Sequence, residues 1–318
     1  ITPEQFKTFP CPTYPEIRLA ILPGKAIQKT VEDFNPDYLH IATEGPLGWA
    51  ARRVALSTRR PFTTAYHTKF PEYVKARFGV PLWLSYAVFR WFHKPAKSVM
   101  VATPSIEKEL RAKGFQNIKR WSRGVDLSVF NSNGRLPNST ADRPKRFLFA
   151  GRVAVEKNIE AFLRLDLPGE KWIAGDGPQK EALQIKYPDA KWLGMLKPDA
   201  LAQVYREADV FVFPSLTDTF GLVMLEAMAC GLPVAAYPVA GPVDVVTSPR
   251  VGALNTDLKK ACIEAAQLNS EDAIHHANGY TWGHATGQFL QNLHLIKRDR
   301  LKAAKRLPHS LPTSAKKA

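Results

Sequence analysis

Two carboxylates lie close together in the stretch TDTFGLVMLEAMACG, which covers residues 217–231. Asp218 comes directly before a predicted helix, and Glu226 follows eight residues later among apolar neighbours. Burying a carboxylate costs free energy unless a partner compensates for it, so Glu226 indicates a binding role. Asp218 could have a simpler role than ligand binding, because an aspartate at this position can cap the helix. Because ionised carboxylates only accept hydrogen bonds, the pair suits the hydroxyl groups of a sugar.

Basic side chains and glycines follow two predicted strands earlier in this half of the chain. In open parallel sheets, ligands bind at the edge formed by the carboxyl ends of the strands, where glycine also permits a close backbone approach. A helix N-terminus at that edge binds anions. The residues concerned are Arg152 and Lys157 in GRVAVEK, Gly175 and Gly177 in AGDGP, and the helix start at DTFG. Singly, each has a simpler explanation as a solvated charge or a plain turn. Together they predict a site for a diphosphate and sugar hydroxyls, hence for a nucleotide sugar.

Short apolar strands alternate with helices through most of the sequence, which predicts an α/β fold with parallel sheets covered on both faces. The alternation occurs twice, on either side of a polar stretch, and indicates two Rossmann-like domains that face a cleft. The predicted boundaries are a first domain at 1–130, a linker at 131–146, a second domain at 147–280, a helix at 281–298 that packs back on the first domain, and a basic, disordered tail at 299–318.

The beginning of the sequence lacks the early strand and glycine-rich turn that normally open a Rossmann-like unit. The first domain is therefore predicted to be N-terminally incomplete, with Ile1 at the end of a strand.

The composition, with 45% hydrophobic and 23% charged residues, is typical of a globular protein, and no apolar run is long enough to cross a bilayer. Three scattered cysteines fit neither a disulfide framework nor a zinc site, which favours reduced thiols in the cytoplasm. The net charge of +15 is uneven: 20 basic against 10 acidic residues at 1–130 give +10, 16 against 18 at 131–296 give −2, and 8 against 1 at 297–318 give +7. This asymmetry indicates a polyanionic partner, either a membrane surface or a nucleic acid, unless it serves solubility alone.

The segment KARFGVPLWLSYAVFRWFHKPAK at 75–97 interleaves aromatic and basic residues on what we predict to be one helix. The pattern suits a helix on an anionic membrane surface, and a buried helix with basic ends explains it equally well. The candidates for membrane or acceptor contact are Lys75, Arg77, Trp83, Arg90, Trp91 and Lys94. The sequence has no RNP-type segment, helix-turn-helix spacing or zinc cluster, so a nucleic-acid partner is not expected.

The run FVFPSLTDTFGLVMLEAMACGLPVAA resembles the signature of glycosyltransferase family 4, the retaining glycosyltransferases with the GT-B fold. GRVAVEK, AGDGP, YREADVFVFPS, ATPSIEKELRAKGF and RGVD are similar to further segments of that family, so the resemblance covers most of the chain. Asp218 stands where the family usually has a glutamate, which shortens the first carboxylate. HTKFPEY and the signature itself are most similar to bacterial mannosyl- or lipid glycosyltransferases.

The resemblance implies transfer of a hexose from GDP-mannose or a UDP-hexose to a lipid or a cell-envelope glycan, without a metal or other cofactor. Glu226 would bind the ribose, Asp218 the sugar hydroxyls, and Arg152 and Lys157 the diphosphate, while His67 would be the family's first-domain histidine. The other donor-site residues it implies are Gly151, Gly175, Gly177 and Phe220, with the backbone of Gly221 and Leu222.

The resemblance also implies a cytoplasmic enzyme, peripheral on the inner face of the cell membrane. One alternative is a family member that binds nucleotide sugar but turns it over poorly or not at all, because the family's N-terminal strand, loop and helix are not recognised in the sequence. A more remote alternative is a nucleic-acid-binding protein, which only the net charge favours.

Overall fold

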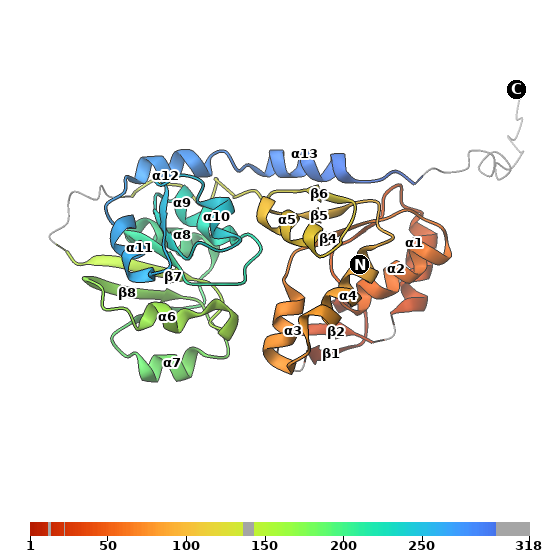
Figure 1. Ribbon diagram of the computed structural model, residues 1–318, viewed down its shortest axis with the longest axis horizontal. Helices are drawn as coiled ribbons and strands as arrows, with labels where there is room; N and C mark the ends of the chain where they lie inside the picture. The colour runs from red at the N-terminus through yellow and green to blue at the C-terminus, as the bar shows by residue number, and fades with distance from the viewer. Residues whose placement is uncertain (12–13, 22, 136–142, 297–318) are drawn as a thin grey trace, which may run out of the picture.

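The computed structural model of the chain describes residues 1–11, 14–21, 23–135 and 143–296, without the side chains of 14–17, 76 and 77. Two lobes lie side by side, each with a parallel sheet and helices around it (Figure 1). The predicted α/β class with two parallel sheets is therefore confirmed. Part of the predicted linker, at 136–142, and the whole predicted tail at 299–318 lie outside the described residues.

The sheet of the first lobe has four parallel strands in the order β3-β4-β5-β6. Its strands are β3 (His40–Ile41), β4 (Thr63–Tyr66), β5 (Val99–Val101) and β6 (Ile118–Arg120), and the helices between them include α2 (Pro46–Ser57) and α5 (Pro104–Ala112). Thr103 caps α5 by accepting a hydrogen bond from the Ile106 amide, and Pro104 occupies the first helical position.

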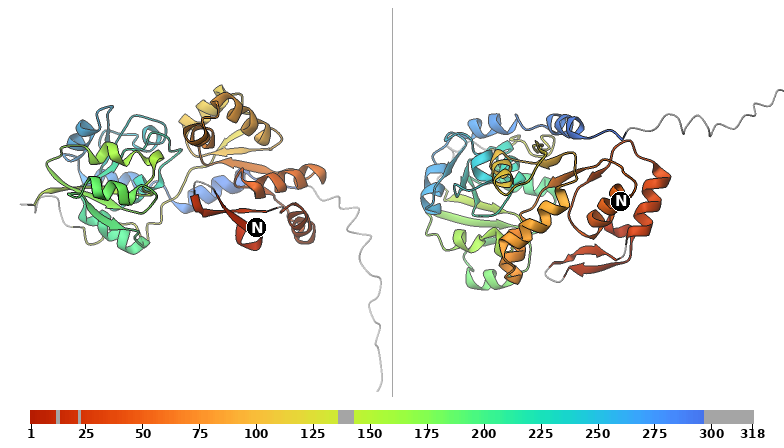
Figure 2. Two further views of the ribbon diagram at one scale, coloured as in Figure 1. Left: turned by 90° about the horizontal axis from the view of Figure 1, so that it is seen from below. Right: turned by 45° about the vertical axis from the view of Figure 1, so that its right-hand side comes forward.

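The chain before β3 forms elements that the sequence analysis does not predict. A 3₁₀ turn (η1, Pro3–Gln5) leads into an antiparallel hairpin of β1 (Thr8–Cys11) and β2 (Tyr14–Ala20), and α1 (Gly24–Phe34) follows. Figure 2 shows the hairpin on the first lobe. The prediction that Ile1 ends a strand is wrong, because Ile1 lies before η1 and the first strand starts at Thr8.

The aromatic segment at 75–97 contains the end of one helix and the whole of a second, so the prediction of a single helix is wrong. The two helices are α3 (Phe70–Phe78) and α4 (Leu82–His93). Gly79 ends α3 in the left-handed conformation, with φ of +67°, which glycine adopts readily. Pro81 directly precedes α4 and lacks the amide hydrogen that a continuous helix needs.

The sheet of the second lobe has six parallel strands in the order β12-β11-β10-β7-β8-β9. Its strands are β7 (Lys145–Ala150), β8 (Gly169–Ala174), β9 (Lys191–Gly194), β10 (Val210–Phe213), β11 (Val234–Ala236) and β12 (Gly252–Leu254). The helical elements are η3 (Val155–Lys157), α6 (Ile159–Leu163), α7 (Lys180–Lys186), α8 (Pro198–Glu207), α9 (Leu222–Ala229), α10 (Pro242–Val245), α11 (Leu258–Ala265) and α12 (Ser270–Ala277). The strand β7 starts two residues before the predicted domain boundary.

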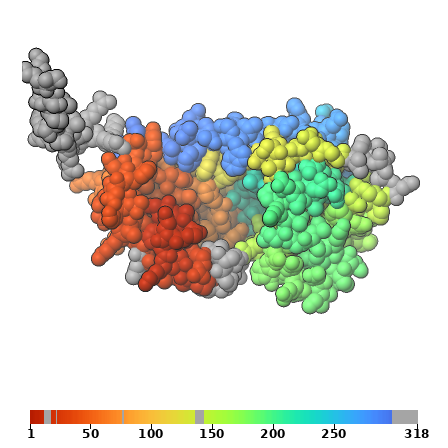
Figure 3. Space-filling model, turned by 180° about the vertical axis from the view of Figure 1, so that it is seen from behind, coloured from red at the N-terminus to blue at the C-terminus, as the bar shows by residue number. Residues whose placement is uncertain are grey.

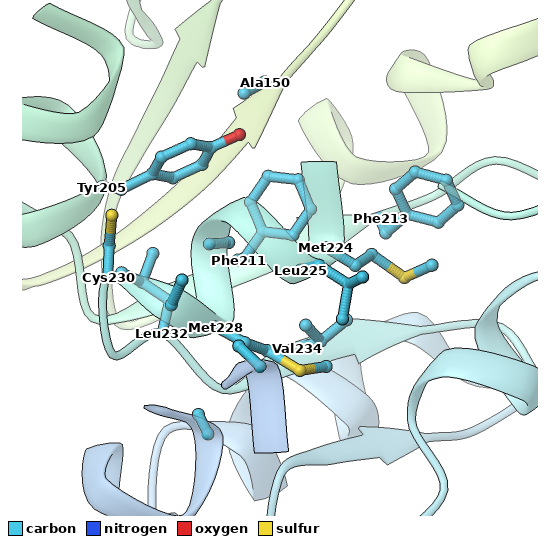
Figure 4. Packing of buried hydrophobic residues seen from close by; sticks show 14 of the residues in the cluster. Ala150, Tyr205, Phe211, Phe213, Met224, Leu225, Met228, Cys230, Leu232 and Val234 are labelled. Carbon is cyan, nitrogen blue, oxygen red and sulfur yellow. The ribbon is translucent and has the colours of Figure 1, made fainter. Parts of the chain in front are cut away.

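Most residues of helix α9 are buried in the core of this lobe. Met224, Leu225 and Met228 are fully buried and pack against Phe211 of β10 and other core residues (Figure 4). Full burial of a Leu, Met or Phe side chain stabilises a fold by roughly 1.5–3 kcal/mol each. The core therefore holds α9, and with it the loop that carries Asp218, in a fixed position on the sheet.

The chain returns to the first lobe at its end. Helix α13 (Trp282–Asn292) lies on the first lobe beside β6, whereas α12 lies on the second (Figures 1 and 3), and α13 is shorter than the predicted 281–298. Gln288 accepts a hydrogen bond from the Ser122 amide at 2.8 Å, and the Phe289 ring lies 4.7 Å from that of Trp121. None of the described helices combines the length and apolar character needed to cross a membrane.

Candidate active site

A cavity of about 560 Å³ lies between the lobes, at the carboxyl edges of both sheets. Its wall brings together four residues singled out in the sequence: His67 from the first lobe and Arg152, Lys157 and Asp218 from the second. Hydrogen bonds cross between the lobes at this point, since the Thr219 hydroxyl donates to the His67 carbonyl at 2.6 Å. We call this space the first cavity.

Lys157 and Asp218 form an ion pair inside the first cavity. The Lys157 ammonium lies 2.7 Å and 2.9 Å from the two carboxylate oxygens of Asp218. Lys157 ends the η3 turn that follows β7, whereas Asp218 lies in the loop between β10 and α9. Their side chains are 23% and 16% exposed, so solvent screens the pair only in part. One cation and one hydrogen-bond acceptor are thereby held side by side on the cavity wall.

His67 is held by an arginine from another part of the chain. The Arg123 guanidinium donates a hydrogen bond to Nδ1 of His67 at 2.6 Å and lies over the Trp121 ring. A guanidinium stays protonated and has no acceptor, so Nδ1 must accept and the imidazole proton must lie on Nε2. Burial lowers the pKa of His67 to about 4, and the nearby Arg123 and His40 act in the same direction. At neutral pH, His67 is therefore an uncharged hydrogen-bond donor through Nε2.

A second cavity of about 560 Å³ adjoins the ends of β7, β8 and β9, and Arg152 lines both cavities. Gly151, Gly175 and Gly177 form part of its wall. The wall also contains the apolar side chains of Met195, Leu196, Leu201 and Val223. A side chain at Gly175 is excluded, because its Cβ would lie 1.8 Å from the Gly151 carbonyl oxygen. Glycine is thus required where these two loop backbones approach each other. The cavity that they border, with its partly apolar wall, suits a flat group such as a nucleoside.

The N-terminus of α9 lies between the two cavities. Thr217, Asp218 and Thr219 line the first cavity, whereas Val223 lines the second. Gly221, which precedes α9, has a φ of +84°, a conformation that favours glycine. The free amides of a helix N-terminus attract anions. A group that extends from one cavity to the other passes Arg152 and this helix end.

Three predicted donor-site residues at this helix end, Phe220, Gly221 and Leu222, do not line either cavity. Phe220 is 6% exposed and packs in the core, with its ring 6.3 Å from that of Tyr280. The side chain of Leu222 also packs against the core. The side chains of Phe220 and Leu222 therefore contribute to core packing, and only their backbone groups contribute to the N-terminus of α9.

Glu226 lies on the same face of α9 as Val223, three residues away, but does not itself line either cavity. The Tyr205 hydroxyl donates a hydrogen bond to Glu226 Oε2 at 3.5 Å. Burial raises the pKa of the Glu226 carboxyl, which the hydrogen bond from Tyr205 offsets in part. The side chain is thus a partly buried carboxylate close to the second cavity, with a single weak partner among the described residues.

The aromatic and basic candidates on α3 and α4 separate into two groups. Trp83 is 74% exposed, and Trp91 is also exposed, although it stacks on Trp49. In contrast, Tyr86 and Phe92 of the same segment are buried in the core of the first lobe. The basic candidates Lys75, Arg90 and Lys94 are exposed, and the Arg77 side chain lies outside the described structure. The two interpretations of this segment, a membrane-surface helix and a buried helix with basic ends, each describe part of it, because one face is buried and the other is exposed.

Several wall residues of the cavities were not anticipated, and three of them illustrate why. Glu44 lines the first cavity, and Met195 and Leu196 line the second. Glu44 lies in TEGPLG, and the glycine directly after it could have indicated a binding loop. Arg123, the partner of His67, belongs to RGVD, a segment noted only for its resemblance.

Two family models match the chain, one over each lobe. The model of glycosyltransferase family 4 matches residues 1–129, and that of the group 1 glycosyl transferases matches residues 144–268. The chain belongs to glycosyltransferase family 4. Together the two matches include every residue that lines the two cavities.

Relatives with known names agree with this assignment. The sulfoquinovosyl transferase of Arabidopsis thaliana is 33% identical over 265 residues, which cover 77% of this chain and 51% of that protein. The GDP-mannose-dependent alpha-mannosyltransferase of Mycobacterium tuberculosis is 31% identical over 241 residues, which cover 73% of this chain and 64% of that protein. The family member described here thus spans between half and two thirds of the length of these relatives.

Solved structures show the same fold. Sucrose-phosphate synthase from Thermosynechococcus elongatus matches with a TM-score of 0.67 and 22% identity, over 84% of this chain and 75% of that one. Anabaena Alr3699/HepE, solved in complex with UDP, matches with a TM-score of 0.65 and 18% identity, over 84% and 80% of the two chains. The predicted GT-B architecture, two Rossmann-like domains facing a cleft, is confirmed for this family member.

Proposed function

We propose that this protein transfers a hexose from a nucleotide-diphosphate sugar to a hydroxyl group of a lipid or a cell-envelope glycan, with retention at the anomeric carbon. The observation that carries the proposal is the pair of cavities that meet at Arg152 and the N-terminus of α9. The second cavity suits the nucleoside, the junction suits the diphosphate, and the first cavity suits the sugar beside Asp218 and His67. GDP-mannose and a UDP-hexose both fit this arrangement.

In the proposed reaction, the bond between the anomeric carbon and the diphosphate oxygen breaks, and that oxygen keeps the electron pair. The acceptor oxygen forms the new bond on the same face of the sugar, and its proton passes to the leaving diphosphate. Arg152, Lys157 and the α9 amides stabilise the charge that develops on the leaving group. Asp218 accepts hydrogen bonds from sugar hydroxyls, and His67 donates one from Nε2. We propose that these cationic groups serve in place of a metal ion, so turnover should persist in EDTA.

The acceptor side of the proposal rests on the apolar part of the first cavity and on the exposed aromatic face of α4. The cavity wall beside His67 is apolar over one flank, formed by Leu19, Phe70, Tyr73, Val74, Phe78 and Phe89. Trp83 is exposed, and basic side chains at Lys75, Arg90 and Lys94 accompany it. Aromatic and basic groups together favour an anionic membrane surface. We propose a peripheral enzyme on the cytoplasmic face that takes a lipid acceptor.

A thermal-shift screen against GDP, UDP and ADP sugars tests the donor site. At a ligand concentration of about 100 times Kd, binding stabilises the folded protein by about 2.7 kcal/mol, which is easily measured. We expect one nucleotide sugar to stabilise the wild type and to lose this effect in Glu226→Ala and Lys157→Met. If none of the sugars stabilises the wild type, the proposed function is wrong.

Flotation with vesicles tests the membrane surface. We expect the protein to float with vesicles of phosphatidylglycerol and phosphatidylcholine, and not with phosphatidylcholine alone. Trp83→Ser should weaken flotation, whereas Trp282→Ser, which removes a tryptophan exposed on α13, should leave it unchanged. Equal flotation of the two variants would contradict a docking role for α4.

A further inference from the structure

The first cavity has a nearly buried carboxylate in its wall to which the proposed function gives no role. Glu44 lies in the loop between β3 and α2, and only 4% of its side chain is exposed. Its Oε1 lies 3.0 Å from Nε2 of His93, and Nδ1 of His93 lies 2.8 Å from Oγ1 of Thr64. His93 and Thr64 are both buried. The three side chains form a column that runs from the interior of the sheet to the cavity wall.

The register of the sheet places Glu44 next to the predicted active-site histidine. β3 and β4 are parallel neighbours, and Ile41 pairs with Thr64. Glu44 and His67 each follow three residues after that pair, at the same edge of the sheet, and both line the first cavity. A ligand group that contacts His67 therefore lies within the neighbourhood of Glu44.

Hydrogen bonds on both sides of His93 hold the column together. A carboxylate only accepts, so Nε2–H of His93 donates to Glu44. On the other side of the ring, Nδ1 is hydrogen-bonded to the Thr64 hydroxyl. Because all three side chains are enclosed, these two hydrogen bonds orient the carboxylate without using its second oxygen.

The carboxylate has acceptor capacity left over. A carboxylate offers about four lone-pair positions, and His93 is its sole hydrogen-bond partner among the described residues. A buried charge with so few partners is costly, which indicates that a ligand completes its hydrogen bonds. The ligand must supply hydroxyl donors at this end and an apolar portion along the flank that includes Phe70 and Phe89.

We propose that Glu44 is the carboxylate that binds the acceptor. It accepts a hydrogen bond from a hydroxyl of a sugar or polyol head group, next to the hydroxyl that attacks, while the apolar part of the acceptor follows the aromatic flank. His93 and Thr64 are positioning residues that hold Glu44 in this orientation. The proposal rests on the proposed function, because that function defines the acceptor. Glu44 takes up no proton, so the balance of the transfer step is unchanged.

Binding of n-octyl β-D-glucopyranoside, a soluble amphiphile with a sugar head group, tests the proposal. It is titrated below its micelle concentration into protein saturated with the nucleotide that stabilises it, and tryptophan fluorescence is followed. We expect saturable binding to the wild type and at least tenfold weaker binding to Glu44→Gln, with the same thermal shift by nucleotide in both. Glu32→Gln, at an exposed position on α1, is the matched control and should bind like the wild type.

The positioning residues have their own test. Thr64→Val removes the hydrogen-bond partner of His93 Nδ1 at nearly constant volume and should weaken octyl glucoside binding, and Thr64→Ser should restore it. If Glu44→Gln does not fold, Glu44→Asp keeps the charge, shortens its reach and should show the same loss.

Two outcomes overturn the inference: a folded Glu44 variant that binds octyl glucoside like the wild type, or a nucleotide-bound wild type that shows no saturable binding. Failure of the wild type to bind any nucleotide would instead refute the proposed function, so the two failures are distinguishable.

Discussion

Replacing Arg123 by methionine should change how His67 titrates. In the folded protein the pKa of His67 is about 4, against an ordinary value of 6.5. At about 1.4 kcal/mol per pKa unit, this difference corresponds to a free energy on the order of 3 kcal/mol. Below pH 6.5 the unfolded chain binds a proton at His67 that the folded protein does not bind until about pH 4. The stability contribution of neutral His67 is therefore present above pH 6.5 and is lost as the pH falls toward 4.

Arg123→Met removes one cause of the lowered pKa and leaves the larger one, burial. We expect the pKa of His67 to rise above 4 and to stay below 6.5, and the acid loss of stability to shrink accordingly. Methionine keeps much of the apolar stem that lies over Trp121. Arg123→Lys retains the charge and serves as the control, with a pKa of His67 near that of the wild type.

Nitrogen-15 NMR of labelled histidine measures both the tautomer and the pKa, with His67→Gln to assign the signal. The wild type should show the Nε2–H tautomer at neutral pH and a midpoint near pH 4. A wild-type midpoint near 6.5, an Nδ1–H tautomer, or an unchanged midpoint in Arg123→Met would each refute the argument from the Arg123 contact.

Three further substitutions test the donor site. Gly175→Ala should lower the free energy of unfolding by about 1–3 kcal/mol, because the loop must move to accommodate the Cβ, and should abolish the thermal shift by nucleotide. The control is Gly287→Ala on α13, which has open space around it and should be neutral or stabilising. Because burial raises the pKa of Glu226, its ionised form lowers the stability of the folded protein at neutral pH. Glu226→Gln should therefore be at least as stable as the wild type in urea unfolding at pH 8. The same variant should bind nucleotide sugar at least tenfold more weakly. Asp218→Asn should bind free nucleotide like the wild type but lose any preference for the nucleotide sugar in calorimetric titration, and a retained preference would contradict a role for Asp218 in sugar binding.

Much of the architecture could be predicted because the signals are local. The alternation of apolar strands and helices is present in each lobe, and the residues at strand ends in GRVAVEK and AGDGP do line the cavities. The break between α3 and α4 was also present locally, in Gly79 and Pro81, but the continuous aromatic pattern obscured it. The hairpin of β1 and β2 has no comparable pattern, since its strands belong to a separate two-stranded sheet.

The partners of the site residues could not be predicted, because they lie far apart in the sequence. Arg123 is 56 residues from His67, and His93 is 49 residues from Glu44. Phe220 shows the opposite case, because it belongs to the motif and yet its side chain packs in the core.

The sequence by itself determined the family, the order of the elements and the edge of each sheet at which polar residues gather, since these follow from motifs and periodicity within short stretches. Only the tertiary structure decided the state of those residues. It paired Lys157 with Asp218, placed the His67 proton on Nε2 and buried Glu44 against His93. Charge, tautomer and burial depend on neighbours that folding brings together from distant parts of the chain, and no local pattern contains them.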